Sequence, residues 1–158
     1  MKHVQWPVFA ALLWGAGLTG CDRTIEGETK PAGDEPSALE RRLDSAQVER
    51  GRIVYEKNCQ VCHGDQGKGL PGDWRVRDAD GFYPPPPLDD SAHAWHHPTA
   101  VLLEVIRDGS PAGEGKMPAW QGTLTEQDMQ DVVVYIKSLW SDPVYRLWLK
   151  MERQSLEP

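Results

Sequence analysis

Two cysteines and a histidine form the most specific motif of the chain, Cys59-Gln60-Val61-Cys62-His63. This C-x-x-C-H spacing is typical of c-type haem attachment. Two thiols three residues apart on a helical turn lie on one side, where each can add to a vinyl group of a haem, and the imidazole that follows lies beneath the iron. We therefore predict one covalently bound haem on Cys59 and Cys62, with His63 as the proximal iron ligand.

Paired cysteines also occur in zinc sites and in thioredoxin-type redox sites. A zinc site needs further ligands of this kind, but Cys21 is the one other cysteine in the sequence. A thioredoxin-like pair follows a buried strand, whereas residues 52–57 continue an amphipathic helical pattern up to the motif. The haem interpretation is therefore preferred.

The second ligand of the iron decides what the centre does, because an iron with two protein ligands mainly passes electrons. Thioether and imidazole are the suitable ligand types. The candidates are Met117, Met129, Met151, His93, His96 and His97. Met117 is the best placed, since it precedes Pro118 in an extended loop just before a helical segment, and the proline restricts the backbone there. Met129 is predicted to be a packing residue of that segment.

The chain resembles class I cytochromes c over most of residues 45–140. The resemblance includes the attachment motif, the glycine-rich loop Gly64–Gly69 after it, and the Met117-Pro118 ligand loop. It implies an all-α cytochrome c fold, in which N- and C-terminal helices cross and loops wrap the haem. It also implies that His63 and Met117 are the axial ligands, a pair that raises the reduction potential relative to two histidines.

Two predicted helices carry the residues of the family's helix crossing. The first begins at an Asp44 cap and ends near Asn58, and the second begins at a capping box of Thr125 and Asp128. Gly51 and Tyr55 match the positions at which the family's first helix approaches its last one. Tyr135 resembles the aromatic residue of the last helix at that crossing.

A proline-rich run, Phe82–Leu88, lies between the two predicted ligands. In the family a proline carbonyl near the haem edge accepts a hydrogen bond from the axial imidazole, and the resemblance leaves Pro86 and Pro87 as alternatives for this role. A recognition site for an extended polyproline helix is the less favoured interpretation of the run. Residues 72–83 are an insertion relative to minimal members of the family, and the sequence predicts no role for them.

Three histidines, His93, His96 and His97, precede a predicted helix that starts at Pro98 and stops at Gly109. A copper or zinc site is one interpretation, but we favour a role in capping that helix or in binding a haem propionate.

Beyond residue 140 the sequence predicts a C-terminal helical extension, residues 141–158, after a break at Ser141-Asp142-Pro143. Its apolar stripe is predicted to be covered and consists of Val144, Leu147, Trp148 and Met151.

The N-terminus is predicted to direct export. Residues 1–20 have the polar start and apolar stretch of a signal peptide. The following Leu18-Thr19-Gly20-Cys21 resembles the lipobox of bacterial lipoproteins, which implies a lipid anchor on Cys21, and an ordinary secretory signal is the alternative. Residues 21–44 are predicted to be a flexible linker after the lipidated cysteine. Asp22 resembles the residue that retains some lipoproteins at the inner membrane.

The charge balance limits the choice of partners. The 17 Lys and Arg residues against 24 Asp and Glu give a net charge of -7, which argues against nucleic acid. We predict instead redox protein partners with a basic docking patch. The predicted function is one-electron transfer on the periplasmic side of the bacterial inner membrane, by a carrier rather than an enzyme. The alternatives are an electron-entry subunit of a larger oxidoreductase and a haem-based gas or redox sensor in which Met117 is labile.

Overall fold

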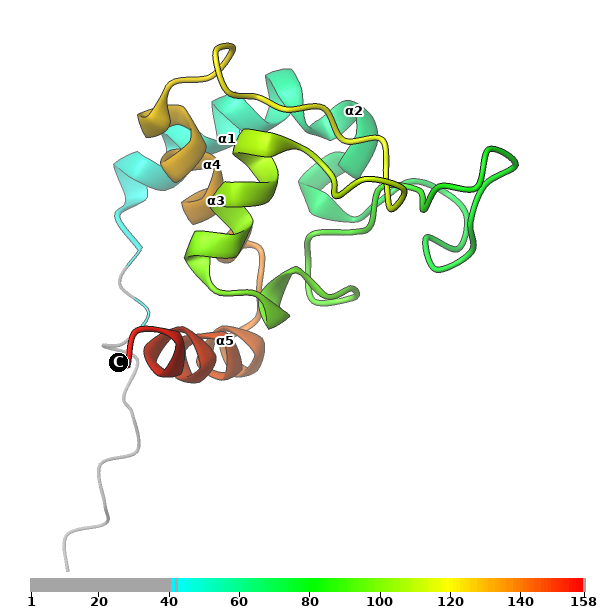
Figure 1. Cartoon of the computed structure of the whole chain (residues 1–158). Helices are drawn as coiled ribbons and strands as arrows, with labels where there is room; N and C mark the ends of the chain where they lie inside the picture. Colours follow the sequence, from blue (N-terminus) through cyan, green and yellow to red (C-terminus); the bar gives the residue numbers. More distant parts are fainter. Residues whose placement is uncertain (1–40, 42, 158) are drawn as a thin grey trace, which may run out of the picture. The chain divides into compact units, whose positions relative to one another are not determined.

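The computed structural model describes residues 41 and 43–157, all within one compact unit that spans Pro36–Pro158. The predicted signal peptide, Cys21 and most of the linker lie outside these described residues. The described part contains α-helices and two short 3-10 helices but no β-strand, which confirms the predicted all-α fold (Figure 1). The elements are α1 (Ser45–Asn58), α2 (Gln60–His63), η1 (Asp65–Gly67), η2 (Ala94–His96), α3 (Thr99–Asp108), α4 (Glu126–Ser138) and α5 (Asp142–Ser155).

The crossing of α1 and α4 is the central packing contact of the fold. At this crossing the α4 backbone touches Gly51 so closely that a Cβ atom there would lie 2.0 Å from the carbonyl oxygen of Asp131. The rings of Tyr55 and Tyr135 meet beside it with their centroids 5.1 Å apart, and both side chains are buried. The predicted crossing by Gly51, Tyr55 and Tyr135 is therefore confirmed.

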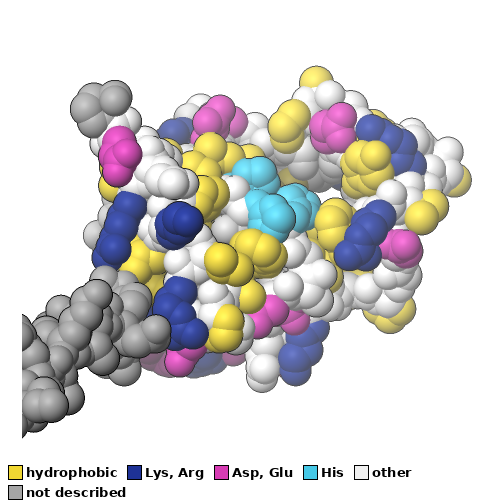
Figure 2. Space-filling model, turned by 90° about the horizontal axis from the view of Figure 1, so that it is seen from below, with side chains coloured by type: hydrophobic (Ala, Val, Ile, Leu, Met, Phe, Trp, Pro, Cys, Tyr) yellow, Lys and Arg dark blue, Asp and Glu magenta, His cyan; other side chains and the backbone are white. Residues whose placement is uncertain are grey.

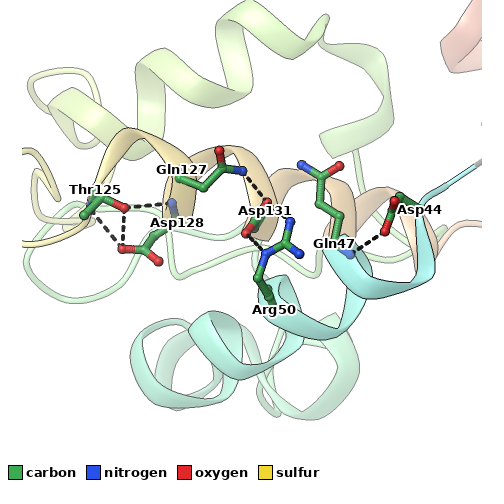
Figure 3. Close-up of polar contacts among 7 residues, drawn as sticks. All are labelled: Asp44, Gln47, Arg50, Thr125, Gln127, Asp128 and Asp131. Atoms are coloured by element: carbon green, nitrogen blue, oxygen red, sulfur yellow. Dashed lines mark hydrogen bonds and ion pairs between the residues drawn. The ribbon is translucent and has the colours of Figure 1, made fainter.

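Side-chain caps fix the starts of both crossing helices. The carboxylate of Asp44 accepts a hydrogen bond from the backbone N–H of Gln47 at 2.8 Å, which begins α1 (Figure 3). Thr125 and Asp128 form the predicted capping box of α4, with each side chain accepting from the other residue's backbone N–H. Such caps satisfy N–H groups that the first helical turn leaves without partners.

Helix α3 lies against α4, and its first turn is capped from another helix. The backbone N–H of Thr99 donates to Glu152 Oε2 of α5 at 2.8 Å, and the Thr99 hydroxyl donates to Oε1 of the same carboxylate at 2.5 Å. The expectation that the preceding histidines cap this helix is therefore wrong, because a carboxylate from α5 already serves its N-terminus. Pro98 is the N-cap residue, so α3 begins at Thr99, one position after the predicted start at Pro98.

Helix α5 follows α4 after a turn at Ser141, and its predicted covered stripe is only partly correct. Trp148 is buried and Val144 and Met151 are partly buried, but the side chain of Leu147 is 56% exposed. The buried face is instead centred on Tyr145 and Trp148, whose rings pack together with centroids 5.1 Å apart. Leu147 falls outside this face, since consecutive helical residues point 100° apart.

Candidate functional site

The C-x-x-C-H motif lies at the junction of α1 and α2. The backbone N–H of Cys59 donates to Tyr55 O at 2.8 Å and ends α1, and the N–H of His63 donates to Cys59 O at 2.9 Å within the next turn. Cys59 and Cys62 are free thiols, the first partly buried and the second exposed. Burial, with a smaller contribution from Cys62, raises the pKa of Cys59 to about 11, so that its thiol is protonated at neutral pH.

His63 is held by the backbone of the proline-rich run. Its Nδ1 atom lies 2.8 Å from the carbonyl oxygen of Pro86, which decides between the two predicted prolines in favour of Pro86. Because a carbonyl can only accept, Nδ1 carries the hydrogen and Nε2 keeps its lone pair in the neutral ring. Burial lowers the pKa of this histidine, and the bond to Pro86 only partly opposes that effect. The ring is therefore buried and neutral, with Nε2 as its acceptor nitrogen.

The glycine-rich loop positions this carbonyl group. Gly67 O accepts hydrogen bonds from Leu88 N at 2.7 Å and from Asp89 N at 3.3 Å, so the proline-rich run is fixed two residues after Pro86. The indole N–H of Trp140 donates to Leu88 O at 2.9 Å and ties the same point to the end of α4. The proline-rich run is thus fixed at its C-terminal end, two residues after the carbonyl group that contacts His63.

Gly64 lets the chain turn directly after His63. Its φ of +76° is a conformation that glycine adopts without steric cost, and a Cβ atom there would lie 2.1 Å from Gly69 O. The hydroxyl of Tyr55 donates to Gly64 O at 2.8 Å, while Gly69 N donates to His63 O at 2.8 Å. The helix crossing and the turn after His63 are therefore connected through one buried tyrosine, Tyr55.

Met117 lies in the connection from α3 to α4, partly buried against the hydrophobic core. Its backbone is held twice by Ser110, whose N–H donates to Met117 O at 3.0 Å and whose hydroxyl accepts from Met117 N at 3.1 Å. Further along, Trp120 N donates to Ile106 O at 3.1 Å and returns the chain to α3. We call residues 110–120, which contain Met117, the thioether loop. These backbone hydrogen bonds define its conformation independently of the Met117 side chain.

Residues 72–83, for which the sequence predicts no role, bind this thioether loop. Lys116 Nζ lies 2.9 Å from Asp78 Oδ2 and 2.6 Å from Asp80 Oδ2. Arg77 donates to Gly113 O at 2.8 Å and stacks over the ring of Tyr83. The inserted segment is therefore a brace for the loop that carries Met117. Local sequence gives no signal for it, because the partners are more than 30 residues apart.

The histidines before α3 form an aromatic cluster rather than a cap (Figure 2, cyan). The ring of His93 stacks on Trp74 with centroids 4.9 Å apart and meets His97 edge-on at 5.5 Å. Over the described residues, no group of three or more His, Cys, Asp or Glu side chains is arranged to hold a metal ion. Two ring nitrogens here, His93 Nδ1 and Trp95 Nε1, are buried without a hydrogen-bond partner in the described structure.

The donor set fits a covalently bound haem with two protein ligands. The chain offers two thiols on adjacent turns, a neutral imidazole oriented by Pro86 and a thioether in a braced loop. Buried N–H groups without partners, such as that of Trp95, are the donors that carboxylate substituents of a cofactor require. No helix of the described chain is both long and apolar enough to cross a bilayer.

Comparison with known proteins identifies one matching family. The family model described as "Cytochrome C oxidase, cbb3-type, subunit III" matches residues 46–136, which include the attachment motif, the proline-rich run, the thioether loop and most of α4.

Individual relatives are similar to this chain over 89 to 141 residues. The cbb3-type cytochrome c oxidase subunit CcoP of Azospirillum sp. (strain B510) is 31% identical over 99 residues, which cover 63% of this chain and 31% of the relative. The subunit FixP of Bradyrhizobium sp. (strain ORS 278) is 33% identical over 89 residues, which cover 56% and 26%. A thiosulfate dehydrogenase of Stutzerimonas stutzeri (strain A1501) is 32% identical over 141 residues, which cover 87% and 40%. The chain thus spans between about a quarter and two fifths of the length of these curated relatives.

Proposed function

This chain belongs to the class I c-type cytochromes, in the family of subunit III of cbb3-type cytochrome c oxidases, and from that premise we propose that it transfers single electrons. Membership of the family implies covalently bound haem c. Such a haem, when bound, supplies an iron that takes up and releases one electron. The residues of the chain attach the haem, supply both axial ligands and keep other reactants away from the iron.

The orientation of His63 is the observation that carries this proposal. The Pro86 carbonyl fixes the tautomer of the ring, and burial keeps the ring neutral at the pH at which Nε2 must coordinate. The thiols of Cys59 and Cys62 lie four and one residues before His63. They would each add across one vinyl group of the haem, so that an S–H bond and the π bond of the vinyl group are replaced by a C–S and a C–H bond.

We propose one haem for these 158 residues. Two covalently attached haems require four cysteines in two motifs, whereas the sequence has three cysteines and a single C-x-x-C-H motif. The absorbance of the pyridine complex of the reduced protein, divided by protein concentration, counts the haems and reports the two thioether linkages.

Met117 is proposed to be the second axial ligand. Replacing Met117 with Ala should leave the haem attached, because the cysteines and His63 are unaltered, but should open the iron to added carbon monoxide and lower the reduction potential. The matched control is Met129→Leu, since Met129 is a buried core residue of α4 and the swap conserves volume. Carbon monoxide spectra of both reduced variants test this proposal. Equal behaviour of the two variants contradicts a ligand role for Met117, and ready binding to the unaltered protein favours a sensor.

A place within a larger oxidoreductase is the second candidate function. The relatives named above are subunits of cbb3-type oxidases or a thiosulfate dehydrogenase, and each is longer than this chain. In such a complex the haem would receive electrons from one partner and deliver them to another polypeptide. Purification of the tagged protein from its native membranes distinguishes the two candidates, since a free carrier is recovered alone and a subunit is recovered with a fixed stoichiometry of partners.

We also propose that the protein is exported and attached to the periplasmic face of the inner membrane through acyl chains on Cys21. The support is the Leu18-Thr19-Gly20-Cys21 sequence after an apolar leader. The intact mass of the exported protein tests this, because a lipidated chain begins at Cys21 and carries the acyl mass. A basic docking patch on the redox partner follows from the net charge of -7, and electron-transfer rates that fall with rising salt are expected for it.

A further inference from the structure

The outer face of α5 is basic and contains an exposed leucine. Arg146, Leu147, Lys150 and Gln154 are all exposed, and their spacing places them on one side of the helix, opposite the buried Trp148. Figure 2 views the molecule from the side on which α5 lies in Figure 1. Lys and Arg side chains gather there beside hydrophobic ones at the left of the view. We call Arg146, Leu147, Lys150 and Gln154 the α5 outer face.

The charge of this face differs from that of the chain as a whole. The chain has a net charge of -7, yet between residues 143 and 154 its one acidic residue is Glu152, which points inward and binds Thr99. Neither Arg146 nor Lys150 forms an ion pair with another described residue. The α5 outer face therefore presents two uncompensated cations to any anionic surface.

The predicted linker meets the folded domain directly beside this helix. The guanidinium of Arg41 donates to the carboxylate of Asp142, the first residue of α5, and to Ser138 O at 3.0 Å. It also lies over the ring of Tyr145 of α5, 5.2 Å from the ring centroid. Arg41, the described residue nearest in sequence to Cys21, is thus fastened to the start of α5.

We propose that the α5 outer face lies on anionic headgroups of the membrane to which the lipid on Cys21 anchors the protein. This orientation would direct the opposite side of the domain toward redox partners. The proposal rests on the lipid anchor proposed above. A random coil of the 20 residues from Cys21 to Arg41 would have an end-to-end distance of about 25 Å, which brings the domain near the membrane but does not orient it. Orientation then depends on the domain's own surface.

Two features of the face suit anionic lipid better than a protein partner. Each Lys or Arg close to an anionic bilayer strengthens association about five-fold, and a leucine on the same side can enter the headgroup region. The face is a single helix side with little relief, and it is already held near lipid by the anchor. An acidic protein or a second copy of this chain would have to compete with a surface present at very high local concentration.

The experiment uses the full-length, lipidated, haem-loaded protein reconstituted in vesicles. A nitroxide spin label is attached to Cys introduced as Gln154→Cys on the α5 outer face, or as Lys57→Cys on exposed α1 for comparison. The vesicles contain a nickel-chelating lipid that accelerates relaxation of nearby nitroxides. One set is made of phosphatidylcholine and the other also contains phosphatidylglycerol, with the same nickel lipid content.

The expected result is faster relaxation of the Gln154→Cys label than of the Lys57→Cys label, and only in the anionic vesicles. Adding Arg146→Gln and Lys150→Gln should lower the ratio of membrane-facing to free orientations about 25-fold, whereas the matched pair Lys57→Gln and Lys68→Gln, combined with the label at residue 154, should leave it unchanged. Equal relaxation of both labels overturns the proposal, as does a shift that depends on protein concentration, which indicates a second copy. Failure to float with either vesicle set refutes the anchor instead.

Discussion

Helix α4 buries two charged side chains in opposite ways. On the side that crosses α1, the Asp131 carboxylate is 3% exposed and accepts hydrogen bonds from Arg50 Nε at 2.7 Å and from Gln127 Nε2 at 2.7 Å (Figure 3). On the side that faces α3 and α5, Lys137 is 6% exposed and donates to the hydroxyl of Thr99 at 2.7 Å, with its ammonium 4.1 Å from the centroid of the Trp148 ring.

The two environments have different consequences for charge. Burial alone would raise the pKa of Asp131, but the hydrogen bonds from Arg50 and Gln127 outweigh it and hold the pKa below its ordinary value. Burial lowers the pKa of Lys137 from 10.5 to about 8, and the Glu152 carboxylate, already bound to Thr99, only partly opposes this. Asp131 thus stays charged because Arg50 and Gln127 donate hydrogen bonds to its carboxylate. Lys137 releases its proton at a lower pH because its partners compensate less for burial.

The α1 side should be the less tolerant of added volume, because backbone meets backbone there. Replacing Gly51 with Val places branched carbon atoms where the Asp131 carbonyl already lies, so we expect a loss of more than ~4 kcal/mol in the free energy of unfolding and a low yield of haem-loaded protein. Denaturant titration of the purified holoprotein measures the effect.

The control for that substitution is Gly113→Ala. Gly113 has a φ of +80° but nothing lies within 4 Å of a Cβ atom built there, so only the backbone conformation opposes alanine. We expect a cost of about 1 kcal/mol. If both variants lost the same stability, close approach of the helices would not be what distinguishes the crossing.

The crossing could be predicted from the sequence, because its determinants are local patterns. The Thr125–Asp128 cap has a spacing that helical geometry interprets directly. Gly51, Tyr55 and Tyr135 are assigned to the crossing because they match positions of class I cytochromes c. The C-x-x-C-H motif is equally local. The resemblance to class I cytochromes c, which rests on such local patterns, implies the all-α fold and the residues of the candidate haem site.

The polar contacts between distant helices and loops could not be predicted, since they join residues far apart in sequence. Arg50 and Asp131 are 81 positions apart, and nothing in the neighbourhood of either indicates the other. The same holds for the brace formed by residues 72–83 and for the Glu152 cap of α3. The helical periodicity of apolar residues predicted that Leu147 is covered, but Leu147 is exposed. How wide a face of α5 is buried depends on its tertiary packing, which the periodicity does not show.

On the α5 side, the sharper test is pH. Between pH 8 and 10.5 the unfolded chain holds a proton on Lys137 that the folded protein has released, so the free energy of unfolding should rise with pH by ~3 kcal/mol from this residue. Lys137→Met should abolish that rise and keep the packing against Trp148. Denaturant midpoints measured at half-unit pH intervals give the slope directly.

The matched control is Lys57→Met, because Lys57 is exposed on α1 and should leave the slope of the unaltered protein in place. If the slope of stability against pH were the same in Lys137→Met as in the unaltered protein, the pKa of Lys137 would not be lowered by burial. Its contacts with Thr99 and Trp148 would then compensate fully for the loss of water. The contrast between the two sides of α4 would then be lost.

The smallest expected effect concerns the matched charge. Asp131→Asn keeps the size of the side chain but removes the charge that Arg50 pairs with, so we expect a loss of ~2 kcal/mol at pH 7. Since the folded-state pKa of Asp131 is depressed, its contribution is complete above the ordinary value of 3.8 and disappears as the pH falls through the folded-state value. The stability difference between the two proteins should therefore shrink below pH 4.

Asp108→Asn, at an exposed site on α3, should change stability by less than about 0.5 kcal/mol at either pH. A difference that persisted in acid would show that shape rather than charge makes Asp131 fit the crossing, and that both sides of α4 depend mainly on packing.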